Sequence, residues 1–189
     1  MRRFKRAFRV PKRTLEARKL KRVAMVALNG FCVIGKRKRG YCGYYDKDGE
    51  TILFRSALEF AFFRIFQEDD QIDSWEYEPE RIPYTYRGKP HKYIIDVRIS
   101  YKDGTTVYAE IKPSAKVEDE LPQVKAAAAI DFFLLEPNTT FKFLTEQDCL
   151  PEYQQALKTL KDDSIPAVIK TRRRKRRTKS PKGIGESKK

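Results

Sequence analysis

The stretch HKYIIDVRISYKDGTTVYAEIK, residues 91–112, decides the fold of this 189-residue chain. Residues 91–101 and 105–112 are rich in Val, Ile and Tyr, which favour β-strands, and Lys-Asp-Gly separates the two segments. We therefore predict two neighbouring antiparallel strands joined by a tight turn.

The register of these strands depends on the length of the turn. A two-residue turn at Asp103 and Gly104 would place Asp96 opposite Ile111 and pointing away from Glu110. In a three-residue loop, Gly104 takes the left-handed third position that such loops favour, and Asp96 then lies opposite Glu110. We predict the three-residue loop, with the two acidic residues roughly 5 Å apart at Cβ.

Lys112 lies two residues beyond Glu110, so it shares a face with Glu110 while Ile111 faces the other way. Two carboxylates held this close repel each other unless a proton or a cation lies between them. Mg²⁺ satisfies both, because it takes oxygen ligands and keeps water molecules that can hydrolyse a phosphodiester. Lys112 could orient or deprotonate that water. The alternative is a simple Glu110–Lys112 ion pair on a solvated strand face, and the presence of Asp96 argues against it.

Segments on either side predict further helices and strands. Apolar residues recur at helical spacing in FRSALEFAFFRIFQ, residues 54–67, and residues 73–86 are extended but interrupted by two prolines. Residues 124–135 and 150–161 predict helices, with a strand at 141–145 between them. This order of elements predicts an α/β (α+β) fold, a central mixed sheet flanked by helices.

Glu59 stands at the start of the first of these helices, where two roles are open. With Ser56 it forms the S-x-x-E pattern of a capping box. Its carboxylate could also complete a metal site or bind a second ion. Trp75 and the phenylalanines of residues 60–66 are more typical of a core than of base stacking.

Charge divides the chain into three parts. Residues 1–40 carry fifteen Lys or Arg and one acid, and residues 170–189 carry eleven and one. Residues 41–169 carry fifteen basic and twenty-four acidic residues. We predict a basic N-terminal arm (1–40), a folded core (41–169) and a disordered basic tail (170–189). Such arms suit DNA phosphates, whereas an acidic core suits DNA only if some acids hold a metal.

Cysteine spacing and the N-terminal sequence indicate which metal sites and which cellular compartment to expect. The three cysteines have no CxxC spacing and His91 is the only histidine, so a zinc site is not expected. The N-terminus lacks the apolar run of a signal peptide, and no stretch reaches transmembrane length. We expect an intracellular protein with no membrane partner.

The pattern D-x(13)-E-x-K on paired strands, after a helix that bears a glutamate, resembles the PD-(D/E)xK nuclease superfamily. FRSALE, SWEYEPERIPY, GKPHKYIIDV and YAEIKP together resemble phage head-completion nucleases, TnsA-type transposon-end endonucleases and junction-resolving endonucleases, over roughly residues 40–148. One departure is Ile95, which stands where the family usually has proline. The Arg-Ser pair at 55–56 and the EIKP ending look closest to the head-completion group.

The resemblance implies a restriction-endonuclease-like core and hydrolysis of DNA that depends on Mg²⁺, with Mn²⁺ as a substitute. The catalytic residues carried over are Glu59, Asp96, Glu110 and Lys112. The metal ligands would be Asp96, Glu110, Glu59 and Ile111. The residues expected to bind DNA, mainly through phosphates, are Arg55, His91, Lys92, Arg172, Arg173, Arg174, Lys175, Arg176 and Arg177.

Several of these assignments have alternatives. His91 is equally typical of a surface loop, and Arg55 could pair with Glu59 instead of a phosphate. Residues 172–177 could be a nuclear import signal or bind a partner protein. The resemblance further implies DNA-end processing in phage head completion, in the host cytoplasm, by a protein that could be virion-associated. Phage neck or portal proteins would be its partners, and it could form a homodimer. The rivals are a TnsA-like or junction-resolving role, with a transposase as partner, and a non-catalytic DNA-binding neck protein that keeps a nuclease fold.

Overall fold

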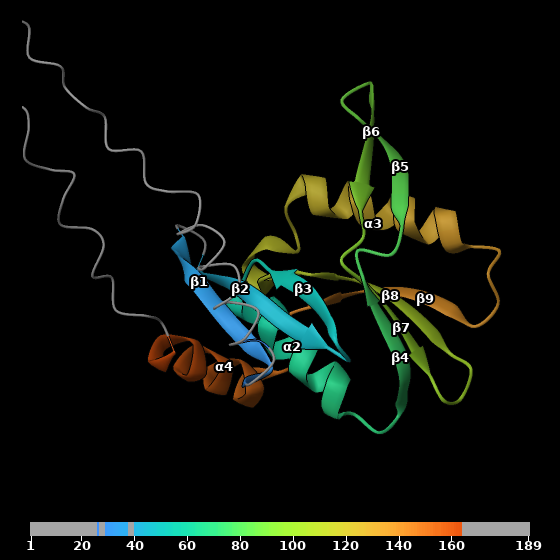
Figure 1. Ribbon diagram of the computed structural model, residues 1–189. Helices are drawn as coiled ribbons and strands as arrows, with labels where there is room; N and C mark the ends of the chain where they lie inside the picture. Colours follow the sequence, from blue (N-terminus) through green and yellow to red (C-terminus); the bar gives the residue numbers. More distant parts are fainter. Residues whose placement is uncertain (1–25, 27–28, 38–39, 164–189) are drawn as a thin grey trace, which may run out of the picture.

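The computed structural model describes residue 26, residues 29–37 and residues 40–163 (Figure 1). The strands are, in chain order, β1 (Phe31–Arg37), β2 (Gly40–Lys47), β3 (Glu50–Phe54), β4 (Ile72–Tyr77), β5 (Arg81–Tyr86), β6 (Lys89–Ile94), β7 (Val97–Tyr101), β8 (Thr106–Ile111) and β9 (Thr139–Leu144). The helices are α2 (Ala57–Glu68), α3 (Glu120–Phe133) and α4 (Leu150–Asp162). Within these ranges, no helix has both the length and the apolar character needed to span a membrane.

The central sheet has the strand order β4-β7-β8-β9. The pairs β4–β7 and β7–β8 are antiparallel, whereas β8 and β9 are parallel because α3 lies on the connection between them. The predicted mixed sheet flanked by helices is therefore confirmed. The predicted helices 124–135 and 150–161 correspond to α3 and α4, and the strand 141–145 corresponds to β9.

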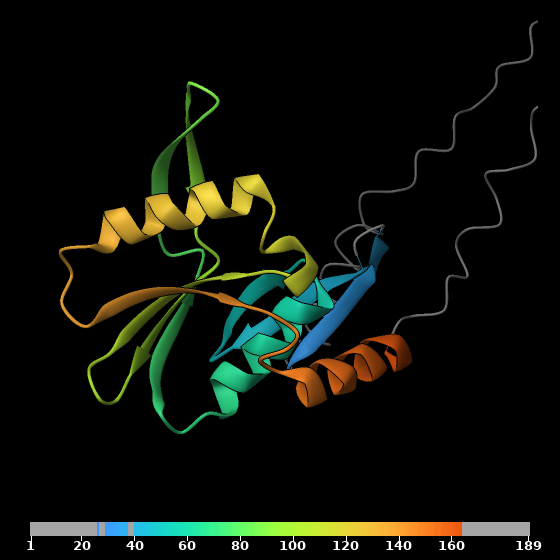
Figure 2. The same ribbon diagram turned by 180° about the vertical axis from the view of Figure 1, so that it is seen from behind.

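Two apolar clusters cover the two faces of this sheet. The larger cluster joins α2, α4 and the β1–β3 sheet to one face, and it includes Val107, Ala109 and Ile111 of β8. The smaller cluster joins α3 and the β5–β6 hairpin to the other face, and it includes Tyr108. Figure 2 shows α3 lying across its face of the sheet, with α2 and α4 on the opposite side. The alternation along β8 is the one that its sequence predicts.

Helix α2 is apolar on nearly all sides, and it is enclosed by the β1–β3 sheet, the central sheet and α4. Its N-cap is Ser56, whose side chain accepts a hydrogen bond from the Glu59 main chain, and its buried residues include four phenylalanines. Phe60 packs against the rings of Phe31 and Phe54, while Phe63 stacks on Trp75. A helix apolar all round is stable only when buried, as this one is between the two sheets. The core role predicted for these aromatic side chains is confirmed.

The β1–β2–β3 sheet was not predicted from sequence. Basic and turn residues interrupt the strand pattern over residues 36–50, so their strand character is weak. Strand β1 also lies within the segment that the charge pattern assigns to a basic arm, and it pairs with β2 from Phe31 onward. Gly43 allows this packing, because a Cβ at that position would lie 2.2 Å from the Cys32 carbonyl oxygen.

The prediction of one continuous strand over residues 91–101 is wrong. The chain forms two strands, β6 and β7, which belong to different sheets and are separated at Ile95 and Asp96. Main-chain hydrogen bonds hold the break, from Glu78 N to Asp96 O (2.8 Å) and from Ile95 N to Glu80 O (3.1 Å). These partners lie on the chain that enters β5, so the contact is remote in sequence from the strand it interrupts.

The loop between β7 and β8 has the predicted three-residue form. Tyr101 N donates to Thr105 O at 2.8 Å, and Gly104 has a φ of 86°, in the left-handed region. Only glycine adopts this conformation without steric cost, and asparagine tolerates it better than other residues.

We expect Gly104→Ala to lower the free energy of unfolding by about 1 kcal/mol, because alanine is strained at positive φ. Nothing lies within 4 Å of the added Cβ, so no clash adds to this loss. Gly104→Asn should lose less than Gly104→Ala. Urea denaturation of the three proteins measures both differences, and equal stability of wild type and Gly104→Ala would contradict the assigned loop.

Candidate active site

Asp96 and Glu110 meet where the β7–β8 pairing ends. Val97 pairs with Ala109, so Asp96, one residue earlier, stands opposite Glu110, one residue later. Val97 and Ala109 are buried in the larger cluster, and Glu110 therefore faces away from it. The charge of Glu110 acts directly on Asp96 and helps to raise its pKa. The register needed to bring the two acids together is present.

The break before β7 fixes the Asp96 side chain. Because β6 leaves the sheet at this point, the main-chain N–H of Ile111 has no strand partner on that side. Asp96 Oδ2 accepts a hydrogen bond from that N–H at 2.8 Å. One oxygen of Asp96 is thus tied to β8, and its other oxygen makes no hydrogen bond with the described part of the chain. This tie orients the carboxylate toward the end of β8, where Glu110 lies.

Glu110 is the sole polar or charged residue among the described ones that is buried, with 6% of its surface exposed. Its Oε1 accepts a hydrogen bond from Lys112 Nζ at 2.6 Å. Its Oε2 is buried without a hydrogen-bond partner among the described residues. A buried carboxylate oxygen that lacks a partner is costly, which is expected where a ligand completes the site.

Burial is the main cause that raises the pKa of Asp96 above its usual 3.8. The negative charge of Glu110 and, more weakly, that of Glu59 raise it further, whereas the Ile111 N–H and Lys112 lower it. With all of these effects together the pKa of Asp96 is about 8, so Asp96 retains its proton near neutral pH. A divalent cation can replace that proton, since it satisfies both charges.

Glu59 makes a helix cap and a wider hydrogen-bond network. Its Oε1 accepts from Ser56 Oγ at 3.2 Å, and its Oε2 accepts from the Arg55 main chain at 2.9 Å and from the Tyr77 hydroxyl at 3.0 Å. Burial raises the pKa of Glu59, and these donors lower it. The capping contact predicted with Ser56 is present, and the carboxylate is close enough to Asp96 for its charge to raise the pKa of Asp96.

Arg55 lies beside this network, and its side chain is held by contacts with the protein. Its guanidinium donates to the Tyr77 hydroxyl and pairs with Glu78, which is its dominant ionic contact. Glu78 has a φ of 54°, an uncommon conformation for a residue other than glycine. The predicted pairing of the Arg55 side chain with Glu59 is not present, since the guanidinium pairs with Glu78 and only the Arg55 main chain donates to Glu59. A phosphate role for the side chain would require exchange of the Glu78 partner.

Two tyrosines belong to the site that the sequence did not single out. Tyr77 holds Glu59, as described above, and Tyr93 lies near the two central acids. Burial raises the pKa of Tyr93, and the charges of Glu110 and Asp96 raise it further. The Tyr93 hydroxyl donates to the Lys125 carbonyl of α3 at 3.0 Å. Both tyrosines read as ordinary strand residues, so no local pattern could have identified them.

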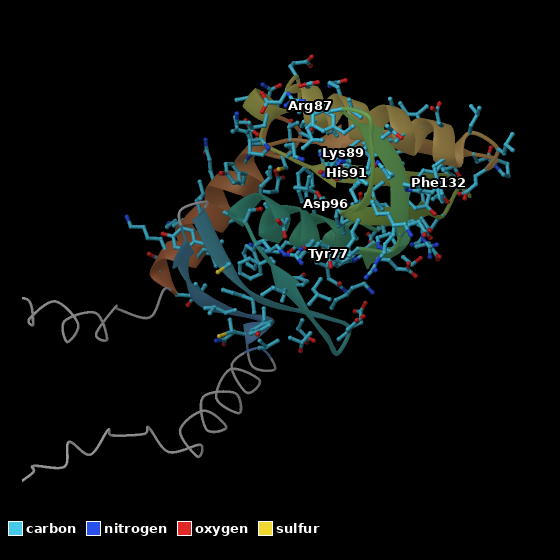
Figure 3. The ribbon with its side chains drawn as sticks, turned by 90° about the horizontal axis from the view of Figure 1, so that it is seen from above. Tyr77, Arg87, Lys89, His91, Asp96 and Phe132 are labelled. Carbon is cyan, nitrogen blue, oxygen red and sulfur yellow. The ribbon has the colours of Figure 1, made fainter. Side chains whose placement is uncertain are left out.

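The remaining predicted residues fall in three places. His91 and Lys92 lie on the exposed β6 strand, where the His91 ring stacks on Tyr84 with centroids 5.3 Å apart. Ile111 has no ligating side chain, so only its main-chain carbonyl could serve as a metal ligand. Arg172, Arg173, Arg174, Lys175, Arg176 and Arg177 lie outside the described residues. Figure 3 marks His91 and Asp96 among the side chains around the hairpin.

The residues present fit a hard divalent ion held by two carboxylates. In the described ranges no three His, Cys, Asp or Glu side chains are grouped closely enough to hold an ion by themselves. Mg²⁺, however, commonly takes one or two protein carboxylates and fills its shell with water and substrate phosphate oxygens. Asp96 and the unpartnered Oε2 of Glu110 supply such a pair. Glu59 could join only by leaving its present hydrogen bonds.

Comparison with known proteins bears on the same segment. Residues 69–146 match a family model described as TnsA-like endonuclease N terminal. The matched segment runs from before β4 to just after β9, so it contains Asp96, Glu110 and Lys112 but not Glu59. No curated protein matches the chain significantly. The sheet that carries the acid pair is therefore similar to the N-terminal domain of TnsA-like endonucleases, which confirms the resemblance to TnsA-type nucleases of the PD-(D/E)xK kind.

Proposed function

We propose that this chain is a Mg²⁺-dependent DNA endonuclease with Asp96, Glu110 and Lys112 at its catalytic centre. The observation that supports this most is the buried Glu110 beside Asp96, with one carboxylate oxygen that has no hydrogen-bond partner in the described part of the chain. The family match over the same strands supports a nuclease. A purely structural role in the core does not explain a buried pair of acids, and neither does a surface ion pair. The strands that carry the pair match a nuclease family.

In this proposal, Asp96 and Glu110 hold the cation, with the Ile111 carbonyl as a further ligand. The cation supplies Lewis-acid stabilisation of charge on the phosphate and activation of water. Lys112 Nζ, now 2.6 Å from Glu110 Oε1, is placed to hold or deprotonate the attacking water or to stabilise developing charge. Glu59, in the first turn of α2, would be a further ligand of the same cation or would bind a second ion.

A plasmid assay tests the proposal. Supercoiled DNA is incubated with the full chain in Mg²⁺, in Mn²⁺ and in EDTA, and conversion to open-circular or linear DNA is followed. We expect cutting with either cation and none with EDTA. Cutting that persists in EDTA, or a chain that binds DNA but cuts it under none of these conditions, would contradict a metal-dependent nuclease.

We propose two narrower biological roles. The first is DNA-end processing in phage head completion, supported by Arg55-Ser56 and the EIKP sequence. The second is TnsA-like cutting at transposon ends, supported by the family match. A junction-resolving role remains a variant of the second. Rates on linear duplex ends, four-way junctions and transposon ends distinguish them, because each role predicts a different preferred substrate.

A binding protein that keeps the nuclease fold without activity is the rival from another class. The complete set of Glu59, Asp96, Glu110 and Lys112 argues against it, because a scaffold gains nothing from a buried acid pair. This rival predicts that, in the presence of Mg²⁺, the wild type and the acid-site variants bind DNA equally and that none of them cuts it.

The basic tail offers a separate prediction. Residues 170–189 carry eleven Lys or Arg, six of them at 172–177. If those six contact phosphates, deleting 170–189 should reduce the slope of log affinity against log salt by about 5. Fluorescence anisotropy with a duplex in Ca²⁺ measures the slope, and circular dichroism checks that the core stays folded. An unchanged affinity would assign the tail to targeting or to a partner protein.

A further inference from the structure

The β5–β6 hairpin differs in charge from the body that carries it. Residues 81–94 contain Arg81, Arg87, Lys89 and Lys92 and no acidic residue, although residues 41–169 as a whole are strongly acidic. A basic element on an acidic body attracts a polyanion locally while the body repels it. The hairpin also stands away from the rest of the molecule, beyond α3 (Figure 1).

The two faces of the hairpin have different surroundings. One face carries Ile82 and Tyr93, which are buried against α3 in the smaller apolar cluster. The other face carries an exposed set from both strands, which consists of Arg81, Pro83, Thr85, Pro90, Lys92 and Ile94. A shallow pocket of about 380 Å³ lies along this part of the hairpin, lined by residues 83–85 and 90–92. One face is thus anchored and the other is free.

The cations of the free face differ from the cation at the turn in their ion pairs. Arg87, at the turn, pairs with Glu120 of α3 at 3.1 Å. Arg81 and Lys92 make no ion pair with any residue that the structure describes. The prolines at 83 and 90 also have no N–H, which makes the hairpin edges poor templates for pairing with a strand of another chain. The free face therefore suits an anion more than a β-strand partner.

The hairpin is joined directly to the acid pair. Asp96 lies two residues beyond the end of β6, and the Glu78–Asp96 and Ile95–Glu80 hydrogen bonds close the foot of the hairpin. A ligand bound to the hairpin is therefore held at a defined position relative to Asp96.

We propose that the β5–β6 hairpin lies in the major groove of duplex DNA, with Arg81 and Lys92 on phosphates of that groove. This inference rests on the proposed nuclease function. The major groove of B-DNA, roughly 12 Å wide, admits a two-stranded β-ribbon. Strands of six residues reach roughly 20 Å, enough to pass along part of a helical turn. The groove then presents the phosphate at the foot of the hairpin to the acid pair.

The test compares Arg81→Ala/Lys92→Ala with the matched variant Lys142→Ala/Lys158→Ala, which removes two exposed cations from β9 and α4. Binding to a 30-base-pair duplex is measured in Ca²⁺ across salt concentrations. We expect the hairpin variant to lose about 2 from the salt slope and the matched variant to keep the wild-type slope. Equal slopes for the two variants would overturn the proposal.

Two further readouts test the groove itself. The wild type should protect guanine N7, an atom of the major groove, from dimethyl sulfate, and the hairpin variant should lose that protection. Double-stranded RNA should compete poorly, because its major groove is too narrow for side chains. Protection confined to the minor groove, or equal competition by RNA, would overturn the proposal. If the wild type cuts plasmid but these results fail, only the hairpin inference falls, whereas a wild type that neither binds nor cuts removes the nuclease function as well.

Discussion

Glu110→Gln should abolish cutting of plasmid DNA in Mg²⁺, with a loss of at least about a thousandfold in rate. The substitution preserves the shape of the side chain and removes the charge that the cation requires. Charge stabilisation by a bound cation is worth several kcal/mol in the transition state, and about 4 kcal/mol corresponds to a thousandfold change. The rate is measured under single-turnover conditions with protein in excess, so that weaker binding does not enter.

Stability and DNA binding separate this effect from misfolding. Glu110 Oε2 has no partner to lose among the described residues, so the variant should fold and melt within a few degrees of the wild type. Its affinity for duplex DNA in Ca²⁺ should stay nearly unchanged. Glu152→Gln makes the same chemical change on the exposed surface of α4 and should cut at the wild-type rate. Equal rates for Glu110→Gln and Glu152→Gln would remove Glu110 from the catalytic centre.

Asp96→Asn should make the protein without metal more stable at high pH. In the wild type, burial and Glu110 raise the pKa of Asp96 from 3.8 to about 8. The folded state therefore retains a proton that the unfolded chain releases above about pH 4. The contribution of Asp96 is fully present below pH 4, declines between pH 4 and 8, and is lost above pH 8. Asparagine stays neutral and can still accept the Ile111 N–H, so it avoids this decline.

We expect the two proteins to have similar stability near pH 4 and to differ by on the order of 2–3 kcal/mol at pH 9, with the variant more stable. Urea denaturation in EDTA across this range measures the difference. Glu59, whose pKa is also raised, gives both proteins a residual slope of the same sign. Mg²⁺ should stabilise the wild type but not Asp96→Asn. Asp70→Asn, at an exposed position, should follow the wild type in every condition. A difference that does not change with pH would contradict a buried, repelling acid pair.

The juxtaposition of the acids could be predicted because it depends on local chemistry. A glycine three residues after Tyr101 selects the loop length, the loop selects the register, and the register decides which residues face each other. The alternation of β8 follows from its own sequence in the same way. The positions of α2, α3 and α4 could be predicted from their own residues, and the start of α2 also from its Ser56 cap.

The break at Ile95 and Asp96 could not be predicted, since residues 91–101 have uniform strand propensity. It arises from hydrogen bonds to Glu78 and Glu80, whose approach depends on the tertiary fold. The same cause hid Tyr77, which reaches Glu59 from a strand eighteen residues away. The β1–β3 sheet was missed because its stability comes from packing on α2 and not from strand propensity. Local sequence thus specified the acid pair but not the network that supports it.

The break also explains how the Asp96 side chain is fixed between β6 and β7. A continuous β6–β7 strand would use the Ile111 N–H in its ladder and leave the Asp96 side chain without that anchor. Separation of the hairpin from the sheet frees the N–H, and Asp96 takes it at 2.8 Å. The hairpin and the acid pair are in this sense two consequences of one interruption.

Anomalous diffraction from crystals soaked in Mn²⁺ tests the central claim most directly. The account predicts a peak at coordination distance from the carboxylates of both Asp96 and Glu110, and loss of that peak in Glu110→Gln crystals. A peak elsewhere, or none at these two side chains at saturating Mn²⁺, would contradict it.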